Sequence, residues 1–167
     1  MPHPRQPPKP HPRQRPNPAE ILVAVASLTT RWVERLLAGN DPPLTPAQFL
    51  ALRAIAAEPL AAAELARRTG VSGAAVSQLV AALEREGWVE RSPEAADRRR
   101  HLLGLTPTGL ETFQSATRVV YGRLGELLSE LPRHEAQELT RLLTRVEHVL
   151  GGSPPPRRPP PPPPRRP

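Results

Sequence analysis

Between residues 19 and 150, apolar residues recur every three or four positions, which is the spacing that gives an α-helix one apolar face. The first such stretch predicts a long amphipathic helix with Asn17 as its N-cap and Pro18 as its first residue, ending at Gly39. Its apolar face consists of Ile21, Val25, Leu28, Trp32 and Leu36. A second helix is predicted from Thr45, as N-cap, to just before Pro59.

A short helix, a glycine and a second capped helix come next. The pattern predicts helices over residues 61–69 and 73–86, with Gly70 in the turn, Ser72 as N-cap and Gly87 at the end. This order is typical of a helix-turn-helix. Many small helical proteins contain such a corner, so the corner alone does not establish DNA binding.

The second of these helices begins with small and polar residues: Ser72, Gly73, Ala74, Ala75, Ser77 and Gln78. A helix that enters the major groove of DNA needs close approach at this end, and its free amide groups can meet a phosphate. The alternative is an exposed, alanine-rich face that only raises helix propensity.

After Gly87 the helical spacing stops. The segments "WVERS" (88–92) and "RRRHLLGLT" (98–106) can each be extended, and "PEAAD" between them reads as a turn, so we predict a two-stranded hairpin. Three like charges, Arg98, Arg99 and Arg100, lie at its tip. An anionic partner would relieve their repulsion, and DNA phosphates or the minor groove beside the preceding helix fit that requirement.

Two further helices are predicted after the hairpin. Thr106 and Pro107 begin a long helix that runs toward Glu130, and a last helix extends to about residue 150. The last helix carries an apolar stripe of Leu139, Leu142, Leu143, Val146 and Leu150. Leucine stripes are more often core than interface, but these helices and the first one cannot cover both apolar sides within one chain. We therefore expect a homodimer.

The prolines and the charge are concentrated at the two ends. Of the 25 prolines, 18 lie in residues 1–18 and 151–167, and these ends carry eight Lys/Arg and no acidic residue. We expect both ends to be disordered tails, and the net charge of +7 to come from them. The tails could be solubilising segments, attract nucleic acid or anionic lipid, or act as polyproline ligands.

Several function classes have little support. The chain has no cysteine, which excludes thiol catalysis, disulfides and cysteine-ligated zinc and is compatible with a cytoplasmic location. No apolar run approaches the roughly 18 residues of a membrane span, so we expect no membrane partner. The histidines lack a zinc-ligand spacing, and no phosphate-binding loop or nucleophile with its base can be placed. We therefore expect no catalytic residue, metal or cofactor, and no enzyme.

The segment "ELARRTGVSGAAVSQLVAALEREGWVER" (64–91), followed by "DRR" (97–99) and "LTPTG" (105–109), resembles the MarR family of winged helix-turn-helix regulators over roughly residues 20–150. The resemblance implies a mainly α fold with a small β-hairpin wing. It assigns residues 19–150 to one MarR-like domain between the tails 1–18 and 151–167. Within it, dimerisation helices would span about 19–38 and 107–150, and the winged helix-turn-helix about 45–106.

The resemblance also implies a homodimer that binds pseudo-palindromic double-stranded DNA as a sequence-specific repressor. Residues 72–86 would form the recognition helix and about 91–105 the wing. Asp97 would orient a wing arginine, and Arg98 or Arg99 would enter the minor groove, with Arg100 on the other side of the strand.

The family also implies a small aromatic or anionic effector that relieves repression. Aromatic contacts to it would come from Trp32, Phe49, Trp88, Phe113 and Tyr121. The alternative function is a nonspecific or architectural nucleic-acid binder driven by the basic tails. A protein-interaction adaptor that uses the C-terminal polyproline segment is a third.

Overall fold

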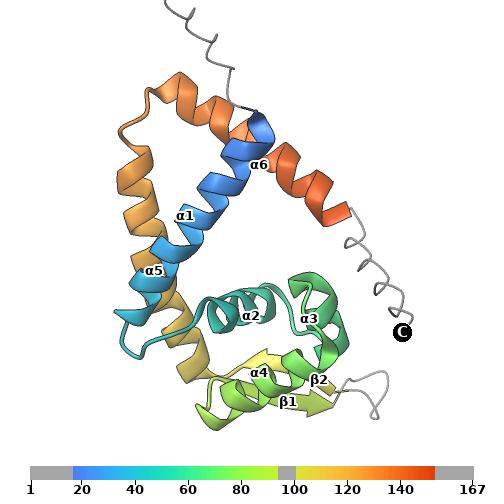
Figure 1. Cartoon of the computed structure of the whole chain (residues 1–167). Helices are drawn as coiled ribbons and strands as arrows, with labels where there is room; N and C mark the ends of the chain where they lie inside the picture. Colours follow the sequence, from blue (N-terminus) through green and yellow to red (C-terminus); the bar gives the residue numbers. More distant parts are fainter. Residues whose placement is uncertain (1–16, 94–100, 153–167) are drawn as a thin grey trace, which may run out of the picture.

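The computed structural model describes residues 17–93 and 101–152. This part of the chain is mainly helical and contains one antiparallel two-stranded hairpin (Figure 1). The elements in order are α1 (Pro18–Ala38), α2 (Pro46–Ala57), α3 (Ala62–Thr69), α4 (Gly73–Arg85), β1 (Val89–Pro93), β2 (His101–Leu105), α5 (Pro107–Leu128) and α6 (Arg133–Gly152). The predicted fold class, mainly α with a small hairpin, is confirmed.

Helices α1, α2, α4 and α5 begin where capping side chains satisfy free backbone amides. The Asn17 side chain accepts a hydrogen bond from Ala19 N–H at 3.0 Å, as expected for the N-cap of α1. At α2, the Thr45 hydroxyl accepts from Gln48 N–H while the Gln48 side chain accepts from Thr45 N–H, which is a capping box. Each of these N-caps depends on residues two or three positions apart in the chain, and the sequence predicts both correctly.

The helix-turn-helix has the predicted turn. Gly70 follows α3 with φ 69°, a left-handed conformation that glycine adopts without strain. Ser72 then caps α4 by accepting a hydrogen bond from Ala75 N–H at 3.3 Å. Gly87, also left-handed with φ 71°, follows the end of α4.

The buried core lies in the winged part of the molecule. It is formed mainly by side chains from α2, α3, α4 and the hairpin, such as Leu52, Leu65 and Leu103. Leu37 of α1 and Val120 of α5 also belong to it. The backbone of Leu60, before α3, pairs with Leu103 of β2 through two hydrogen bonds of 3.3 and 2.9 Å. The helix-turn-helix is thereby attached directly to the wing.

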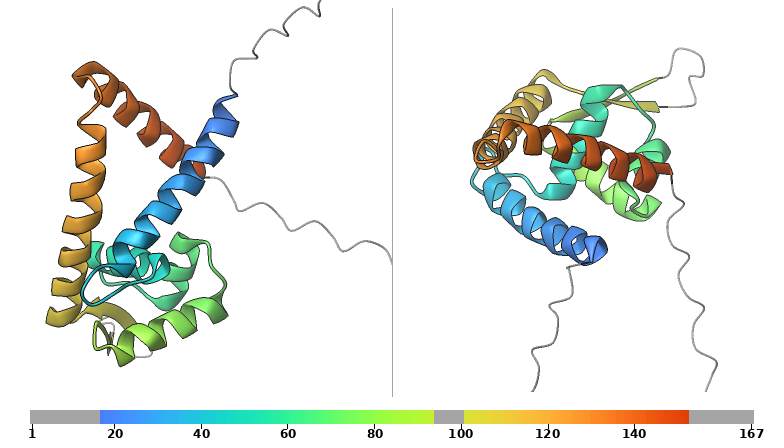
Figure 2. Two further views of the ribbon diagram at one scale, coloured as in Figure 1. Left: turned by 60° about the vertical axis from the view of Figure 1, so that its left-hand side comes forward. Right: turned by 90° about the horizontal axis from the view of Figure 1, so that it is seen from above.

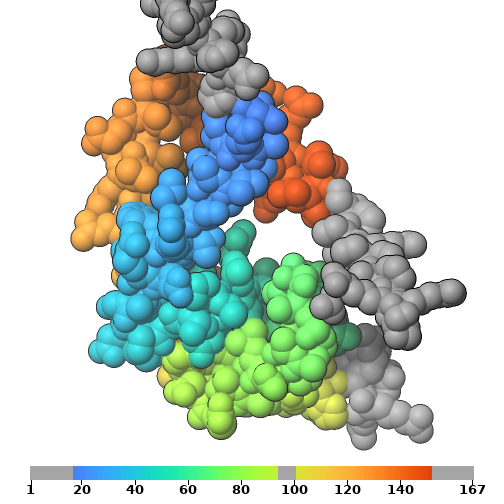
Figure 3. Space-filling view, in the orientation of Figure 1, coloured from blue at the N-terminus to red at the C-terminus, as the bar shows by residue number. Residues whose placement is uncertain are grey.

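Beyond their contacts with this core, α1 and α5 extend away from it, and together with α6 they frame an open triangle (Figures 1 and 2). In the space-filling view an opening remains between α1, α6 and the winged part (Figure 3). Large apolar side chains on these helices are exposed, including Ile21, Val25, Leu28, Leu127, Leu143 and Leu150. None of the described helices is long and apolar enough to cross a membrane.

Candidate nucleic-acid interface

The outward face of α4 is small and uncharged through its first two turns. The six residues predicted to face DNA are all exposed: Ser72, Gly73, Ala74, Ala75, Ser77 and Gln78. The opposite face is buried through Val76, Val80 and Leu83, which orient the helix on the core. A second surface could therefore approach the α4 backbone closely from the outside.

Some polar side chains on this face already make hydrogen bonds within the chain, and others do not. The Ser72 hydroxyl accepts from Ala75 N–H, and the Ser77 hydroxyl donates to Gly73 C=O at 2.9 Å. Within the described part of the chain, the Gln78 side chain makes no hydrogen bond and Arg85 makes no ion pair. An amide at the second turn and a guanidinium at the last turn of α4 are thus available to a ligand.

The predicted hairpin follows α4 directly. Strand β1 pairs antiparallel with β2 from Val89 opposite Leu105 to Pro93 opposite His101. This register puts Pro93 and His101, which the connection 94–100 joins, at the end of the hairpin farthest from α4 and α5. The predicted wing residues Asp97, Arg98, Arg99 and Arg100 lie in that connection, outside the described residues.

An ion pair links the wing to α4. Arg91 of β1 donates from Nε to Glu84 Oε1 at 2.7 Å and from Nη2 to Glu84 Oε2 at 3.3 Å. The hydrogen bonds that Arg91 donates to the Glu84 carboxylate raise the pKa of the Arg91 guanidinium. The base of the wing is therefore held against the last turn of α4 by two parallel hydrogen bonds.

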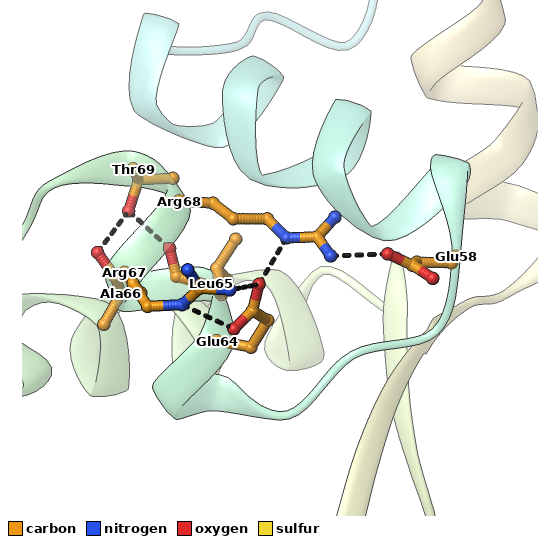
Figure 4. A network of polar contacts seen from close by, with 7 residues as sticks. All are labelled: Glu58, Glu64, Leu65, Ala66, Arg67, Arg68 and Thr69. Atoms are coloured by element: carbon orange, nitrogen blue, oxygen red, sulfur yellow. Dashed lines mark hydrogen bonds and ion pairs between the residues drawn. The ribbon is translucent and has the colours of Figure 1, made fainter. Parts of the chain in front are cut away.

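A second charged network lies on α3 (Figure 4). Glu64 accepts hydrogen bonds from Arg67 and from Arg68, and Arg68 also donates to Glu58, before α3. The hydrogen bonds from Arg68 and Arg67 lower the pKa of the Glu64 carboxyl. Arg67, 77% exposed, is thus partly neutralised although it faces solvent.

The five aromatic residues predicted to contact an effector do not line one pocket. Phe49 lies 5.8 Å from Phe113 and 6.4 Å from Tyr121, measured between ring centroids. Trp32 instead lines a groove between α1 and α5, beside Arg35. Trp88 is only 4% exposed and belongs to the buried core.

Sequence reasoning missed the residues that organise this surface. The Glu84–Arg91 and Arg68–Glu58 pairs join residues seven and ten apart, across a helix end or a turn. Only the bonds from Glu64 to Arg67 and Arg68 have helical spacings, three and four residues, that the sequence could have indicated.

Comparisons with known proteins agree with this arrangement. The family model described as "MarR family" matches residues 43–100. Transcriptional regulator HosA of Escherichia coli is 32% identical over 118 residues, covering 70% of this chain and 83% of HosA. Wild-type MarR from E. coli, without ligand, superposes with a TM-score of 0.69 at 27% identity, covering 80% of this chain and 98% of MarR. A mutant MarR complexed with operator DNA gives a TM-score of 0.64 at 28% identity, covering 77% and 91%.

Proposed function

This chain belongs to the MarR family of transcriptional regulators, and we propose that it is a homodimeric, sequence-specific DNA-binding repressor of pseudo-palindromic operators. The observation that carries the proposal is the exposed, uncharged first half of α4 directly beside the hairpin. A similar chain, MarR, has been solved on operator DNA. Each protomer would then bind one half-site.

We place α4 in the major groove as the recognition helix. Its small residues permit close approach, and Gln78 can both donate to and accept from a base edge. Arg85 would reach a phosphate from the last turn. The wing would put Arg98 or Arg99 into the adjacent minor groove, with Asp97 orienting that arginine.

The homodimer is supported by the apolar surface that one chain leaves uncovered. Leu28 of α1 is 59% exposed and Leu150 of α6 is 64% exposed, and both lie on the helices that frame the open triangle. Burial of such surface against a second copy is favourable by about 25 cal/mol per Å². Leu28→Asp should therefore produce a monomer in sedimentation, whereas Glu111→Gln, on the exposed surface of α5, should not.

We also propose that a small aromatic anion binds this chain and relieves repression. The groove that supports this proposal lies between α1 and α5 and is lined by both Trp32 and Arg35. Trp88→Phe would leave Trp32 as the single tryptophan reporter. Titration of that variant with benzoate should quench its fluorescence and release DNA; no change in either signal would contradict this site.

The function is tested by footprinting the full chain on its own promoter region, with and without residues 1–16 and 153–167. A repressor should protect an inverted repeat, and the protection should survive tail removal. The tails carry eight basic residues, so their removal should lower overall affinity and its salt dependence. Diffuse protection that is lost with the tails would instead favour a tail-driven, nonspecific binder.

A further inference from the structure

The end of α4 and the start of α5 are joined through one side chain, that of Thr106. We propose that Thr106 is a positioning residue that sets the orientation of the recognition helix relative to α5, and so the separation of the two recognition helices in the dimer. This inference rests on the proposed function.

The first half of the junction is the end of α4. Gly87 N–H donates to Glu84 C=O at 3.0 Å, and Trp88 N–H donates to Leu83 C=O at 2.9 Å. This pair of bonds is a Schellman motif, which satisfies the last carbonyl groups of the helix. The carbonyl groups of Gly87 and Trp88, which lie beyond the helix end, accept hydrogen bonds from outside α4.

Thr106 bonds to both of these carbonyl groups. Its backbone N–H donates to Trp88 C=O at 3.1 Å, and its hydroxyl donates to Gly87 C=O at 2.6 Å. The same hydroxyl oxygen accepts from Gly109 N–H at 3.0 Å and so caps α5. Thr106 therefore acts on both helices at once, although it lies 19 residues from Gly87.

The first turn of α5 also approaches the backbone just after α4 without any side chain between them. A Cβ atom at Gly109, in the first turn of α5, would lie 1.9 Å from the Trp88 carbonyl oxygen. The first turn of α5 thus packs directly on the Trp88 peptide group. At this distance, a change in hydrogen bonding at Thr106 changes the angle between α4 and α5.

A small change in that angle would matter for DNA. Helix α5 has 22 residues and is therefore about 33 Å long. A tilt of about 5° at its base displaces its far end by about 3 Å, close to the 3.4 Å rise of one base pair. Figure 1 shows α5 running from this junction to the part of the molecule that we assign to the dimer.

Three variants separate positioning from helix capping. Thr106→Ser keeps both hydroxyl bonds. Thr106→Asp keeps a good N-cap for α5, but an ionised carboxylate only accepts hydrogen bonds and cannot donate to Gly87 C=O. Thr108→Asp is the matched charge control, because Thr108 is exposed in the same turn and its side chain makes no hydrogen bond within the described residues.

The first measurement is the distance between the two α4 helices in the full chain. The chain has no cysteine, so Ala81→Cys, on the exposed face of α4, permits a single spin label per protomer. The labelled Ala81→Cys chain is the parent, and each Thr106 or Thr108 variant is made in it. By pulsed electron spin resonance we expect one narrow distance distribution for the parent, Thr106→Ser and Thr108→Asp. For Thr106→Asp we expect a distribution at least twice as wide.

Equal widths for Thr106→Asp and Thr106→Ser would overturn the proposal. So would the absence of any distance between protomers in the parent, because the chain would then be a monomer. If Thr106→Asp shows no cooperative unfolding in urea, Thr106→Ala replaces it, since it keeps the backbone bond to Trp88 and lacks both hydroxyl bonds. The width of the distance distribution for Thr106→Ala is then compared with that for Thr106→Ser, and equal widths would again overturn the proposal.

The second measurement is selection of duplexes from a random-sequence DNA library by the unlabelled proteins. We expect the wild-type chain, Thr106→Ser and Thr108→Asp to select inverted repeats with one half-site separation, and Thr106→Asp to accept at least two. A single separation for Thr106→Asp would overturn the proposal. Selection of no repeat by the wild-type chain would overturn the proposed function, while the spin-label distances would still report on the junction.

Discussion

Arg91 of β1 binds the carboxylate of Glu84, in the last full turn of α4, with both ends of its guanidinium fork. The two side chains are 44% and 32% exposed, so solvent screens the pair and we expect it to contribute only about 0.5 kcal/mol. Its effect is mainly geometric, because it holds the base of the wing beside α4.

A double-mutant cycle measures this coupling. Glu84→Gln and Arg91→Met, separately and together, should give an interaction energy of about 0.5 kcal/mol in urea unfolding at low salt, decreasing in about 1 M salt. The control is the more exposed Arg123–Glu126 pair within α5, for which we expect a smaller value. Equal coupling in the two pairs would show that the wing contact has no special role.

Gly109 and Gly122 lie in the same helix and should respond to alanine with opposite signs. Gly109→Ala introduces a Cβ against the Trp88 backbone and should lower the free energy of unfolding by about 3 kcal/mol. Nothing lies within 4 Å of a Cβ at Gly122, so Gly122→Ala should raise it by about 0.5 to 1 kcal/mol. Urea unfolding measures both, and a stabilising Gly109→Ala would contradict the close approach.

The wing arginines should contribute directly to DNA affinity. Arg98→Ala and Arg99→Ala should each weaken operator binding by about 1 to 3 kcal/mol if the contact is lost, and a lost phosphate contact should lower the salt slope by about one. Including Arg100→Ala identifies which arginine enters the groove. Arg118→Ala, on the exposed surface of α5, is the control. Unchanged affinity and slope in all three wing variants would remove the wing from the interface.

Glu64 should make folding sensitive to acid. Its carboxyl has a lowered pKa in the folded state because Arg68 and Arg67 bond to the charged form. The stabilisation is therefore present above the ordinary pKa of 4.5 and is lost as the pH falls through the lowered folded value.

The test compares urea midpoints between about pH 6 and pH 3. The midpoint of the wild-type chain should fall more than that of Glu64→Gln. Glu111→Gln, which removes a carboxylate without an ion pair in the described residues, should follow the wild type. Parallel curves for wild type and Glu64→Gln would show that the network does not contribute to stability.

The sequence alone determined the helices, their caps, the turn at Gly70 and the hairpin after Gly87. The helices, caps and turn depend on contacts within about four residues along the chain, such as Ser72 with Ala75, so local spacing and residue type are sufficient to predict them. The hairpin, which pairs Val89 with Leu105, was predicted instead from two extended segments with a turn between them. The exposed first half of α4 follows for the same reason, because burial of Val76 and Val80 on one side leaves Gln78 on the other.

Only the tertiary structure decided which distant residues meet. Thr106 was predictable as the cap of α5, but its bond to Gly87 was not, because it depends on how the hairpin returns the chain to α4. The separation of the aromatic residues also depends on packing: Trp88 lies in the core, as its position after the helix-ending glycine favoured, whereas Trp32 lines a groove between α1 and α5 that the sequence did not indicate. The apolar stripes of α1 and α6 were visible in the sequence, but packing within one chain decided that they remain uncovered.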